Sequence, residues 1–243
     1  MKNVEIDELF INPNPKIGYG FYAIRRSLKK AVTDLQEKIA GDVLDLGCGI
    51  MPYKTFLQSS GKIKNYTAVD LQNSNYHNQI VPDLYWDGII IPVMDNSQDW
   101  VIVTEFLEHY FDTQHILKEI RRVLKPGGRI FFTFPCIYMI HEAPFDYNRF
   151  TPFSIKMHFE NAGFTKTNIY PLGGFNYSLV IMMSLWNKKS GQRGLARLFS
   201  KLFLFLFHKN LLNYDDQMIA DKNDFSIFQN DTTPSGLWGY GRK

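Results

Sequence analysis

Cysteine is scarce in this chain of 243 residues, where only Cys48 and Cys136 occur. Two cysteines do not provide the dense disulfide framework of small secreted domains, and we expect both to be reduced thiols. The spacings Cys-x-x-Cys and His-Glu-x-x-His, which hold metal ions in many proteins, are absent. The sequence therefore predicts neither a disulfide scaffold nor a metal site.

Long hydrophobic runs are also missing. The longest, around 179–186 and 202–207, fall far short of the ~20 residues that a membrane-spanning helix needs. The N-terminus shows no apolar core of a signal peptide. The net charge of +3 is small, and no block of like charges argues for nucleic-acid binding. We expect a soluble, cytoplasmic protein with no nucleic-acid partner.

What the chain does have is a glycine turn behind an apolar strand. Residues 43–53 read Val-Leu-Asp-Leu-Gly-Cys-Gly-Ile-Met-Pro-Tyr. Gly47 and Gly49 carry no Cβ, so the backbone N–H groups of this turn can approach a ligand closely. Pro52 suits the first position of a following helix, which should run to about residue 60. A strand, a glycine turn and a helix N-terminus together indicate a nucleotide site.

The type of nucleotide follows from the residues around the turn. Pro52 stands where the dinucleotide fingerprint Gly-x-Gly-x-x-Gly needs its third glycine. Asp45 suits a cationic ligand better than a pyrophosphate. The string Leu-Asp-Leu-Gly-Cys-Gly resembles motif I of the class I S-adenosylmethionine (SAM)-dependent methyltransferases. The resemblance implies SAM as the cofactor, bound near Asp45, Gly47, Cys48 and Gly49.

Alternating strand and helix patterns extend the motif into an α/β fold. We expect a Rossmann-like, doubly wound seven-stranded sheet in which strands 1–6 are parallel and strand 7 is antiparallel. A Leu-Lys-Pro-Gly-Gly turn at 124–128, between a helix from residue 112 or 113 and a strand at 129–134, is a second landmark of the resembled family. Further strands are predicted at 65–69, 79–81, 100–104, 166–171 and 236–241. The expected organisation is a cofactor-covering segment and helix (1–40), a SAM-binding core (41–171), a helical insertion or lid (172–233) and a final strand (234–243).

Two acids are expected to bind the adenosine part of SAM. Asp70, with Leu71 after it, ends the second strand near the ~20-residue distance from the glycine turn at which an acid binds a ribose. In the resembled family, an acid five residues before a proline contacts the adenine amino group, which implies Asp87 together with Gly88. Asp83 remains an alternative to Asp87.

The methionine part of SAM should meet the end of the fourth strand, because ligands bind at the carboxyl ends of parallel strands. Thr104, Glu105 and Phe106 follow that strand, and Phe106 can contact a sulfonium through its ring face. His109 matches an ordinary Leu-Glu-His segment of the resembled family, and we expect it to be structural. In the helix at 22–38, Arg25 can pair with the SAM carboxylate, and Tyr19 and Tyr22 can also reach SAM. The alternative is that these three residues serve only packing and the surface.

The loop at 135–150 contains more titratable groups than a scaffold requires. It resembles a His-Glu-x-Pro-Tyr-Asp-x-x-Arg-Tyr-Thr stretch of methyltransferases in bacterial surface-polysaccharide biosynthesis, with Phe145 and Phe150 in place of the tyrosines. We hypothesise that His141 is a general base for an acceptor hydroxyl, that Glu142 orients it and that Arg149 holds the acceptor. Alternatively, His141, Asp146 and Arg149 form a network that only braces the loop.

Two apolar helices are predicted at 177–186 and 195–212, the second with interspersed basic residues. It can act as a lid, a dimer contact or a helix on a membrane surface. Residues 213–233 are polar and predicted to be partly mobile.

The sequence thus predicts a methyltransferase that moves a methyl group from SAM to a small-molecule or glycan acceptor, with oxygen favoured because the loop offers a candidate base. One alternative is a non-catalytic SAM-binding or assembly subunit, since motif I reports binding rather than turnover. The other is an NAD-dependent oxidoreductase, which also needs a glycine turn and a ribose acid.

Overall fold

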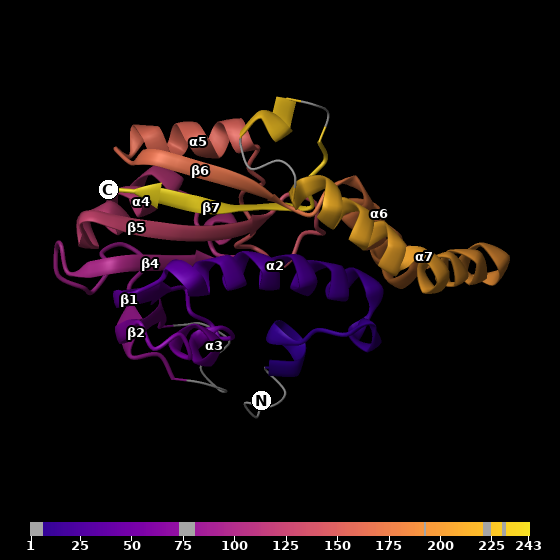
Figure 1. Cartoon of the computed structure of the whole chain (residues 1–243), viewed down its shortest axis with the longest axis horizontal. Helices are drawn as coiled ribbons and strands as arrows, with labels where there is room; N and C mark the ends of the chain where they lie inside the picture. Colours follow the sequence, from indigo (N-terminus) through magenta and orange to yellow (C-terminus); the bar gives the residue numbers. More distant parts are fainter. Residues whose placement is uncertain (1–6, 73–80, 192, 221–224, 230–231) are drawn as a thin grey trace.

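A seven-stranded sheet with helices on both faces forms the body of the protein (Figure 1). The computed structural model describes residues 7–72, 81–191, 193–220, 225–229 and 232–243. The strands are β1 (Gly41–Leu46), β2 (Ile63–Leu71), β3 (Leu84–Trp86), β4 (Gln98–Thr104), β5 (Leu124–Pro135), β6 (Thr165–Leu172) and β7 (Gly236–Arg242). The helices are η1 (Asp7–Ile11), η2 (Pro15–Ile17), α2 (Tyr19–Lys38), α3 (Lys54–Gln58), η3 (Leu107–His109), α4 (Thr113–Val123), α5 (Pro152–Asn161), α6 (Phe175–Lys189), α7 (Gly194–Ala220) and η4 (Phe225–Gln229).

The strand order β3-β2-β1-β4-β5-β7-β6 reverses at β1, as in a doubly wound fold. β1 to β5 pair in parallel, and β7 lies antiparallel between β5 and β6. The expected sheet is confirmed. Its parallel strands end at one common edge, which we call the carboxyl edge.

Side chains alternate between the two faces of the sheet, as the period of a strand requires. Trp100, Ile102 and Phe131 pack with α2 and α3, whereas their neighbours Val101 and Val103 pack with α4 and α5 on the opposite face. Both faces of the central strands are therefore buried, which explains their continuous apolar sequences.

Local signals set several helix ends. Asp112 accepts a hydrogen bond from His115 N and caps α4. Thr151 and Ser154 form a reciprocal capping box at the start of α5, with Pro152 in the first turn. The predicted start of α4 at residue 112 or 113 is confirmed.

Three predicted elements differ from the structure. The strand after β2 lies at Leu84–Trp86, beside the end of β2; of the strand predicted at 79–81, residues 79 and 80 lie outside the described residues, and Val81 is not in a strand. α3 runs from Lys54 to Gln58 and is therefore shorter than the helix predicted from Pro52 to about residue 60. It begins later because Met51 has a positive φ of 51° and the turn continues through Pro52. Lys125–Gly128 form a bulge within β5 rather than a separate turn, since Leu124 already pairs with Gln98.

α6 and α7 project from the body as a helical hairpin (Figure 1). α7 continues to Ala220, so the prediction of a partly mobile segment from residue 213 was wrong for its first eight residues. Asp215 explains the difference. Its buried carboxylate accepts hydrogen bonds from Gly174 N (2.9 Å) and Tyr177 N (3.0 Å), and so caps α6, which begins behind a glycine with no capping side chain.

Candidate active site

A cavity of about 390 Å³ opens at the carboxyl edge of the sheet. Its walls come from the turn after β1, the ends of β4, β5 and β6, the start of β7, helix α2 and the loop after β5. Its lining residues include Phe10, Phe21, Arg25, Gly47, Cys48, Gly49, Tyr53, Thr104, Glu105, His109, Tyr138, His141 and Glu142. Segments far apart in the sequence thus meet at one site.

The glycine turn is fixed from both sides. Gly47 has a φ of 69°, and a Cβ added to it would lie 2.3 Å from the Phe106 ring, so only glycine fits. Gly47 N and Cys48 N both donate to Val69 O at the end of β2 (2.9 and 3.1 Å). These two N–H groups are therefore not available to a ligand, contrary to our expectation. Phe106 lies behind the turn, against Trp86 and Tyr110, and is not part of the cavity wall.

Two buried acids lie at the ends of neighbouring strands β1 and β2. Asp45 accepts a hydrogen bond from the Tyr66 hydroxyl (2.6 Å). The pKa of Asp45 is raised to about 6, chiefly by burial and also by the nearby Asp70 carboxylate, while the hydrogen bond from Tyr66 opposes the rise. Asp70 accepts from Leu71 N (2.8 Å). This end of the carboxyl edge is therefore set up to attract positive charge or hydroxyl donors.

The structure separates the two acids proposed for adenine. Asp87 follows the carboxyl end of β3, beside Gly88, and its Oδ1 accepts from Ile89 N (2.8 Å) and Ile90 N (3.0 Å). Asp83 precedes β3 and its Oδ2 accepts from Ala68 N (2.7 Å). Since ligands meet the carboxyl ends of parallel strands, this placement favours Asp87 over Asp83.

Arg25 of α2 reaches the cavity between two aromatic rings. Its guanidinium carbon lies 3.9 Å from the Phe10 ring centre and 4.6 Å from that of Phe21. No ion pair of Arg25 occurs within the described part of the chain, and its buried Nε–H has no hydrogen-bond partner there. The Tyr53 hydroxyl is likewise buried without a hydrogen-bond partner among these residues. Burial raises the pKa of Tyr53, and the Arg25 charge opposes this rise.

Glu105 turns from the end of β4 into the cavity wall. Its φ of 50° is held by β5, because Glu105 N donates to Thr133 O (3.0 Å) and the Thr133 hydroxyl donates to Glu105 Oε1 (2.9 Å). Thr104, the last residue of β4, also lines the cavity. Burial raises the pKa of Glu105, although the Thr133 bond opposes this.

Asp146 organises the loop after β5. Its side chain is 2% exposed and receives two hydrogen bonds from Arg149, at 2.5 and 2.8 Å. The same carboxylate lies 3.2 Å from His141 Nδ1 and accepts from His141 N (2.9 Å). Its bonds with Arg149 hold the pKa of Asp146 well below the usual range. The bracing network is therefore present, and Asp146 holds the ring that we had expected Glu142 to orient.

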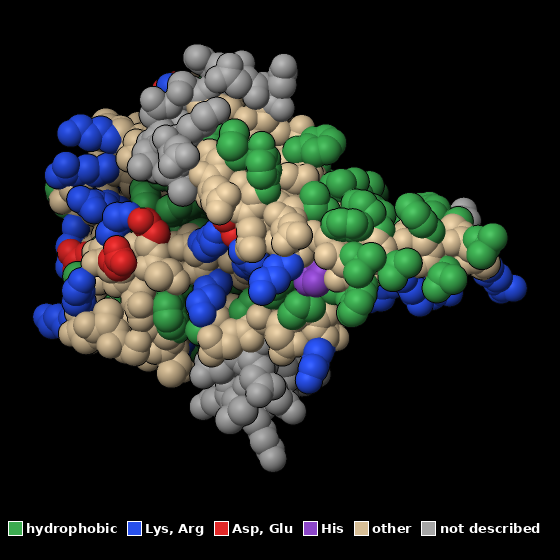
Figure 2. Space-filling model, turned by 45° about the vertical axis from the view of Figure 1, so that its right-hand side comes forward, with side chains coloured by type: hydrophobic (Ala, Val, Ile, Leu, Met, Phe, Trp, Pro, Cys, Tyr) green, Lys and Arg blue, Asp and Glu red, His purple; other side chains and the backbone are tan. Residues whose placement is uncertain are grey.

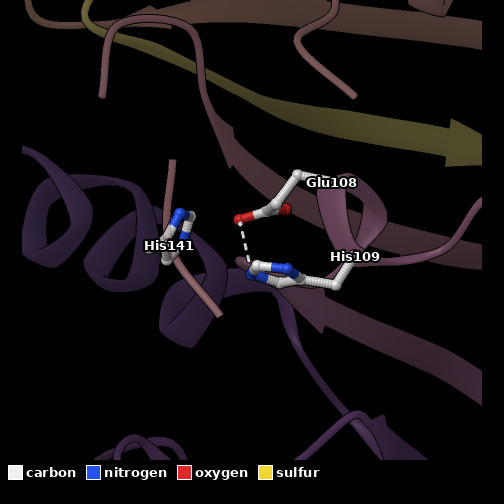
Figure 3. A group of neighbouring side chains, drawn as sticks. All are labelled: Glu108, His109 and His141. Carbon is white, nitrogen blue, oxygen red and sulfur yellow. Dashed lines mark ion pairs between the residues drawn. The ribbon is translucent and has the colours of Figure 1, made fainter. Parts of the chain in front are cut away.

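Glu108, His109 and His141 lie side by side at this wall (Figure 3). Glu108 and His109 come from the short helix η3, and His141 comes from the loop opposite. His109 Nε2 is 3.8 Å from Glu108 Oε1, and the two imidazole rings have centres 4.8 Å apart. His109 Nδ1 contacts Phe145 O at 2.8 Å, which leaves Nε2 facing the group. His109 thus lines the cavity as well as bracing the loop.

Glu108 is fully buried, and neither carboxylate oxygen has a hydrogen-bond partner among the described residues. Burial and the nearby Glu105 raise the pKa of Glu108 well above its usual range. Its main-chain oxygen anchors the loop by accepting from Tyr147 N (2.8 Å) and Asn148 N (3.1 Å).

The same three side chains offer two imidazoles and a carboxylate, ligand types that zinc and related ions accept. Their potential ligand atoms lie within 4.8 Å of one another. Bonds of about 2.0–2.1 Å to a tetrahedral zinc would place ligand atoms roughly 3.4 Å apart, so the group is wider than a formed metal site. Proton transfer is the chemistry that this arrangement supports better.

The structure gathers part of the predicted site in one place. Gly47, Cys48, Gly49, Thr104, Glu105, His141 and Glu142 line the cavity, together with Arg25. Asp45, Asp70, Leu71, Asp87, Gly88, Phe106 and Arg149 are not part of its wall. Tyr53 and Tyr138 line the cavity and were missed, because no local sequence pattern distinguishes a cavity residue from a core residue. Glu108, which is buried beside His109, was missed as well.

Comparison with known proteins agrees with this geometry. Residues 44–132 match the family described as methyltransferase domain. The chain carries a class I SAM-dependent methyltransferase domain. SAM is accordingly the cofactor of this domain. A SAM-dependent methyltransferase from Archaeoglobus fulgidus has the same fold, with a TM-score of 0.56 at 13% identity over 100% of both chains.

Two curated relatives match the methyltransferase domain in sequence. The 27-O-demethylrifamycin SV methyltransferase of Amycolatopsis mediterranei is 30% identical over 122 residues, 43% of this chain and 45% of the relative. A demethylmenaquinone methyltransferase of Corynebacterium kroppenstedtii is 32% identical over 99 residues, 40% of this chain and 42% of the relative. The matches thus span less than half of either relative.

Proposed function

We propose that this protein transfers the methyl group of SAM to a hydroxyl of a small-molecule or sugar acceptor. One observation carries the proposal: the motif I turn and the histidine-bearing loop, almost a hundred residues apart in sequence, line the same cavity. A SAM site and a proton acceptor in one cavity are the two requirements for O-methylation.

The residues of the carboxyl edge fit the parts of SAM. Asp70 and Leu71 lie at the end of β2 for the ribose, and Asp87 and Gly88 lie at the end of β3 for the adenine. Arg25, which has no ion-pair partner among the described residues, is the candidate for the SAM carboxylate. The Gly47–Gly49 turn lies between these two groups. Adenine, ribose and the glycine turn are thus assigned to the ends of β3, β2 and β1, which are neighbours in the sheet.

His141 is the proposed general base. When bound, SAM supplies an electrophilic methyl carbon on a positively charged sulfur. His141 accepts the hydroxyl proton while the acceptor oxygen bonds to that carbon, and the electron pair of the broken carbon–sulfur bond stays on sulfur. Asp146, 3.2 Å from His141 Nδ1, holds the imidazole in position. His109, whose ring contacts that of His141, can share the proton.

The other two proposed catalytic residues take different roles. Glu142 lines the cavity and is placed to contact the acceptor. Arg149 gives two hydrogen bonds to Asp146, so we now assign it to positioning of the loop rather than to the acceptor. An oxygen target is supported by the name of the rifamycin relative, which specifies a 27-O position.

Binding and transfer are tested separately. Calorimetry with S-adenosylhomocysteine should show binding, weakened at least tenfold in Arg25→Gln, whereas NAD should not bind. Binding of NAD alone would instead support the oxidoreductase alternative. Asp70→Asn should weaken binding as well, and Lys118→Gln, an exposed cation on α4, is the control.

Labelled SAM is then offered with a panel of sugars, sugar nucleotides, lipid-linked sugars and small hydroxyl compounds. Transfer to any of them supports the proposal, and a chelator should leave the rate unchanged if His141 acts as a base. Loss of activity with chelator would instead indicate a metal held by Glu108, His109 and His141. Tight cofactor binding without transfer to the whole panel would favour the non-catalytic alternative.

A further inference from the structure

The hairpin of α6 and α7 carries a surface that nothing in the described protein covers. We call residues 182–191 and 193–212 the arm. Large apolar side chains of α7 are 50–83% exposed there: Leu195, Leu198, Phe199, Leu202, Phe205 and Leu206. With roughly 200 Å² for one fully exposed large side chain, these six expose on the order of 700 Å², more than the largest apolar patch of a typical monomer.

The arm is attached to the body only at its root. Leu204 and Leu212 of α7 pack with Tyr177, Val180 and Ile181 of α6. Asp216 pairs with Arg26 and Lys30 of α2, each at 2.5 Å. By contrast, every described residue from 193 to 199 is exposed. Intramolecular packing thus accounts for one narrow stripe of α7 and leaves its other sides apolar and uncovered.

Charge on the arm has one sign. No Asp or Glu occurs between Glu160 and Asp215. Six exposed cations occupy the arm: Lys188, Lys189, Arg193, Arg197, Lys201 and Lys209. None of these six makes an ion pair within the described ranges of the chain. Figure 2 shows apolar side chains along the projecting arm, blue cations on its underside and tip, and no acidic side chain on it.

We propose that the arm binds an anionic lipid surface, with Leu and Phe side chains entering the interface and the cations contacting lipid phosphates. Apolar residues interspersed with Lys and Arg are the pattern by which helices lie in a membrane interface. No described helix is long and apolar enough to span a membrane, so the arm lies on the surface.

A second copy of the chain fits this surface less well. A symmetric dimer through the arm would bring its cations against the same cations of the partner, and the arm has no carboxylate to pair with them. A membrane with anionic headgroups supplies the missing charge and an apolar layer together. This inference concerns binding alone and stands whether or not methyl transfer occurs.

If the protein transfers a methyl group as proposed, membrane binding also limits the class of acceptor. Tyr138 lines the cavity and packs against the root of the hairpin beside α6 and α7. The active site is therefore next to the proposed lipid-binding helices. An acceptor carried by a membrane lipid is the class that this arrangement favours.

Flotation with vesicles tests the inference. The full-length protein should float with phosphatidylcholine vesicles that contain phosphatidylglycerol, and much less with phosphatidylcholine alone. Raising the salt concentration should release it, because surface charges are screened. Neutralising Arg197, Lys201 and Lys209 to Gln should weaken binding about a hundredfold, at about fivefold for each cation. Leu198, Phe199 and Leu202 to Gln should weaken it at least tenfold.

Matched controls keep the test specific. The charge control replaces three exposed cations outside the arm with Gln, namely Lys16, Lys64 and Lys118, and changes the net charge by the same amount. The apolar control replaces three exposed apolar residues outside the arm with Gln, namely Val81, Met94 and Met157. Both control variants should bind vesicles like the parent. Circular dichroism melting curves show that each variant is folded, without using cofactor binding or activity.

Three results would overturn the inference. The parent protein fails to float with anionic vesicles, the controls lose as much binding as the arm variants, or analytical ultracentrifugation shows a dimer that dissociates in the Leu198, Phe199 and Leu202 variant. The last result would assign the surface to a second copy. S-adenosylhomocysteine binding measured on the same samples separates this failure from a failure of the proposed function.

Discussion

The carboxyl edge of the sheet and the arm treat the same residue types in opposite ways. At the edge, apolar side chains are buried and the Asp146 carboxylate is paired with Arg149 and His141. On the arm, apolar side chains face water and the cations make no ion pair within the described residues. Apart from its cavity, the carboxyl edge is covered by packed side chains. The arm packs against the body only at its root. The exposed apolar side chains of its tip would be buried only by contact with another surface.

The contrast is sharpest within α7 itself. Leu204 is 2% exposed and Leu202, half a turn away, is 50% exposed. The sequence around both is nearly uniform Leu and Phe. Contact with α6 and α2 distinguishes the packed side of the helix from the free side.

The largest effect should come from the catalytic loop. His141→Ala removes the proposed base and should lower kcat about a thousandfold, within the range for general base catalysis. Cofactor affinity should stay within twofold, because His141 is not assigned to SAM. Steady-state rates with calorimetry check both values. Unchanged methylation would show that the network of Asp146 only braces the loop.

The difference between the packed and free sides of α7 can be measured by paired substitutions. Leu204→Ala should lower the free energy of unfolding by about 3 to 4 kcal/mol, as for other buried leucines. Leu202→Ala should change it by less than about 0.5 kcal/mol. Urea denaturation of both variants is the measurement. Equal effects would mean that Leu202 is also buried in solution.

Asp45 should make the edge sensitive to pH. Its pKa is raised to about 6 in the fold, so the protein binds this proton more tightly when folded. Stability from this group is therefore full below about pH 4 and is lost as the pH rises through 6, by at most about 3 kcal/mol. Asp45→Asn should remove this dependence.

The measurement for Asp45 is the difference in unfolding free energy between parent and Asp45→Asn, followed from pH 4 to 7. The difference cancels the contributions of other titrating groups. A difference that does not change across this range would contradict the raised pKa.

The smallest effect should come from a local cap. Thr151→Ala removes the side-chain bond to Ser154 N at the start of α5 and should cost about 1 kcal/mol. Thr151→Ser keeps the hydroxyl and is the control. Thermal melting should separate the two variants by several degrees, and identical curves would show that the capping box adds little.

Much of the fold could be predicted because its signals are local. The glycine turn needs positive φ at Gly47, and Thr151 with Pro152 starts a helix on its own. The third strand could not be placed, because Leu84–Trp86 is short and is fixed by pairing with β2 rather than by its own pattern.

The candidate site was predictable only in part. Motif I located Gly47 and Gly49. The expected contact of the turn's N–H groups with a ligand was wrong for Gly47 and Cys48, because both donate to Val69 O. The alternative of a bracing network already contained His141, Asp146 and Arg149, but nothing in the order of the loop decided that Asp146 rather than Glu142 would hold the His141 ring. Glu108 belongs to the ordinary Leu-Glu-His segment, and its sequence context does not indicate that its carboxylate is fully buried.

The sequence by itself determined the alternation of strands and helices, the turn after β1 and the absence of acid along the arm. These depend on periodicity, backbone conformation and composition, which are properties of neighbouring residues. Only the tertiary structure decided that Arg25, Tyr53, His109 and His141 share one cavity, that Asp215 caps α6, and that most of α7 has no partner within the described chain. Those facts depend on contacts across long distances in sequence, and such contacts form only when the sheet brings distant segments together.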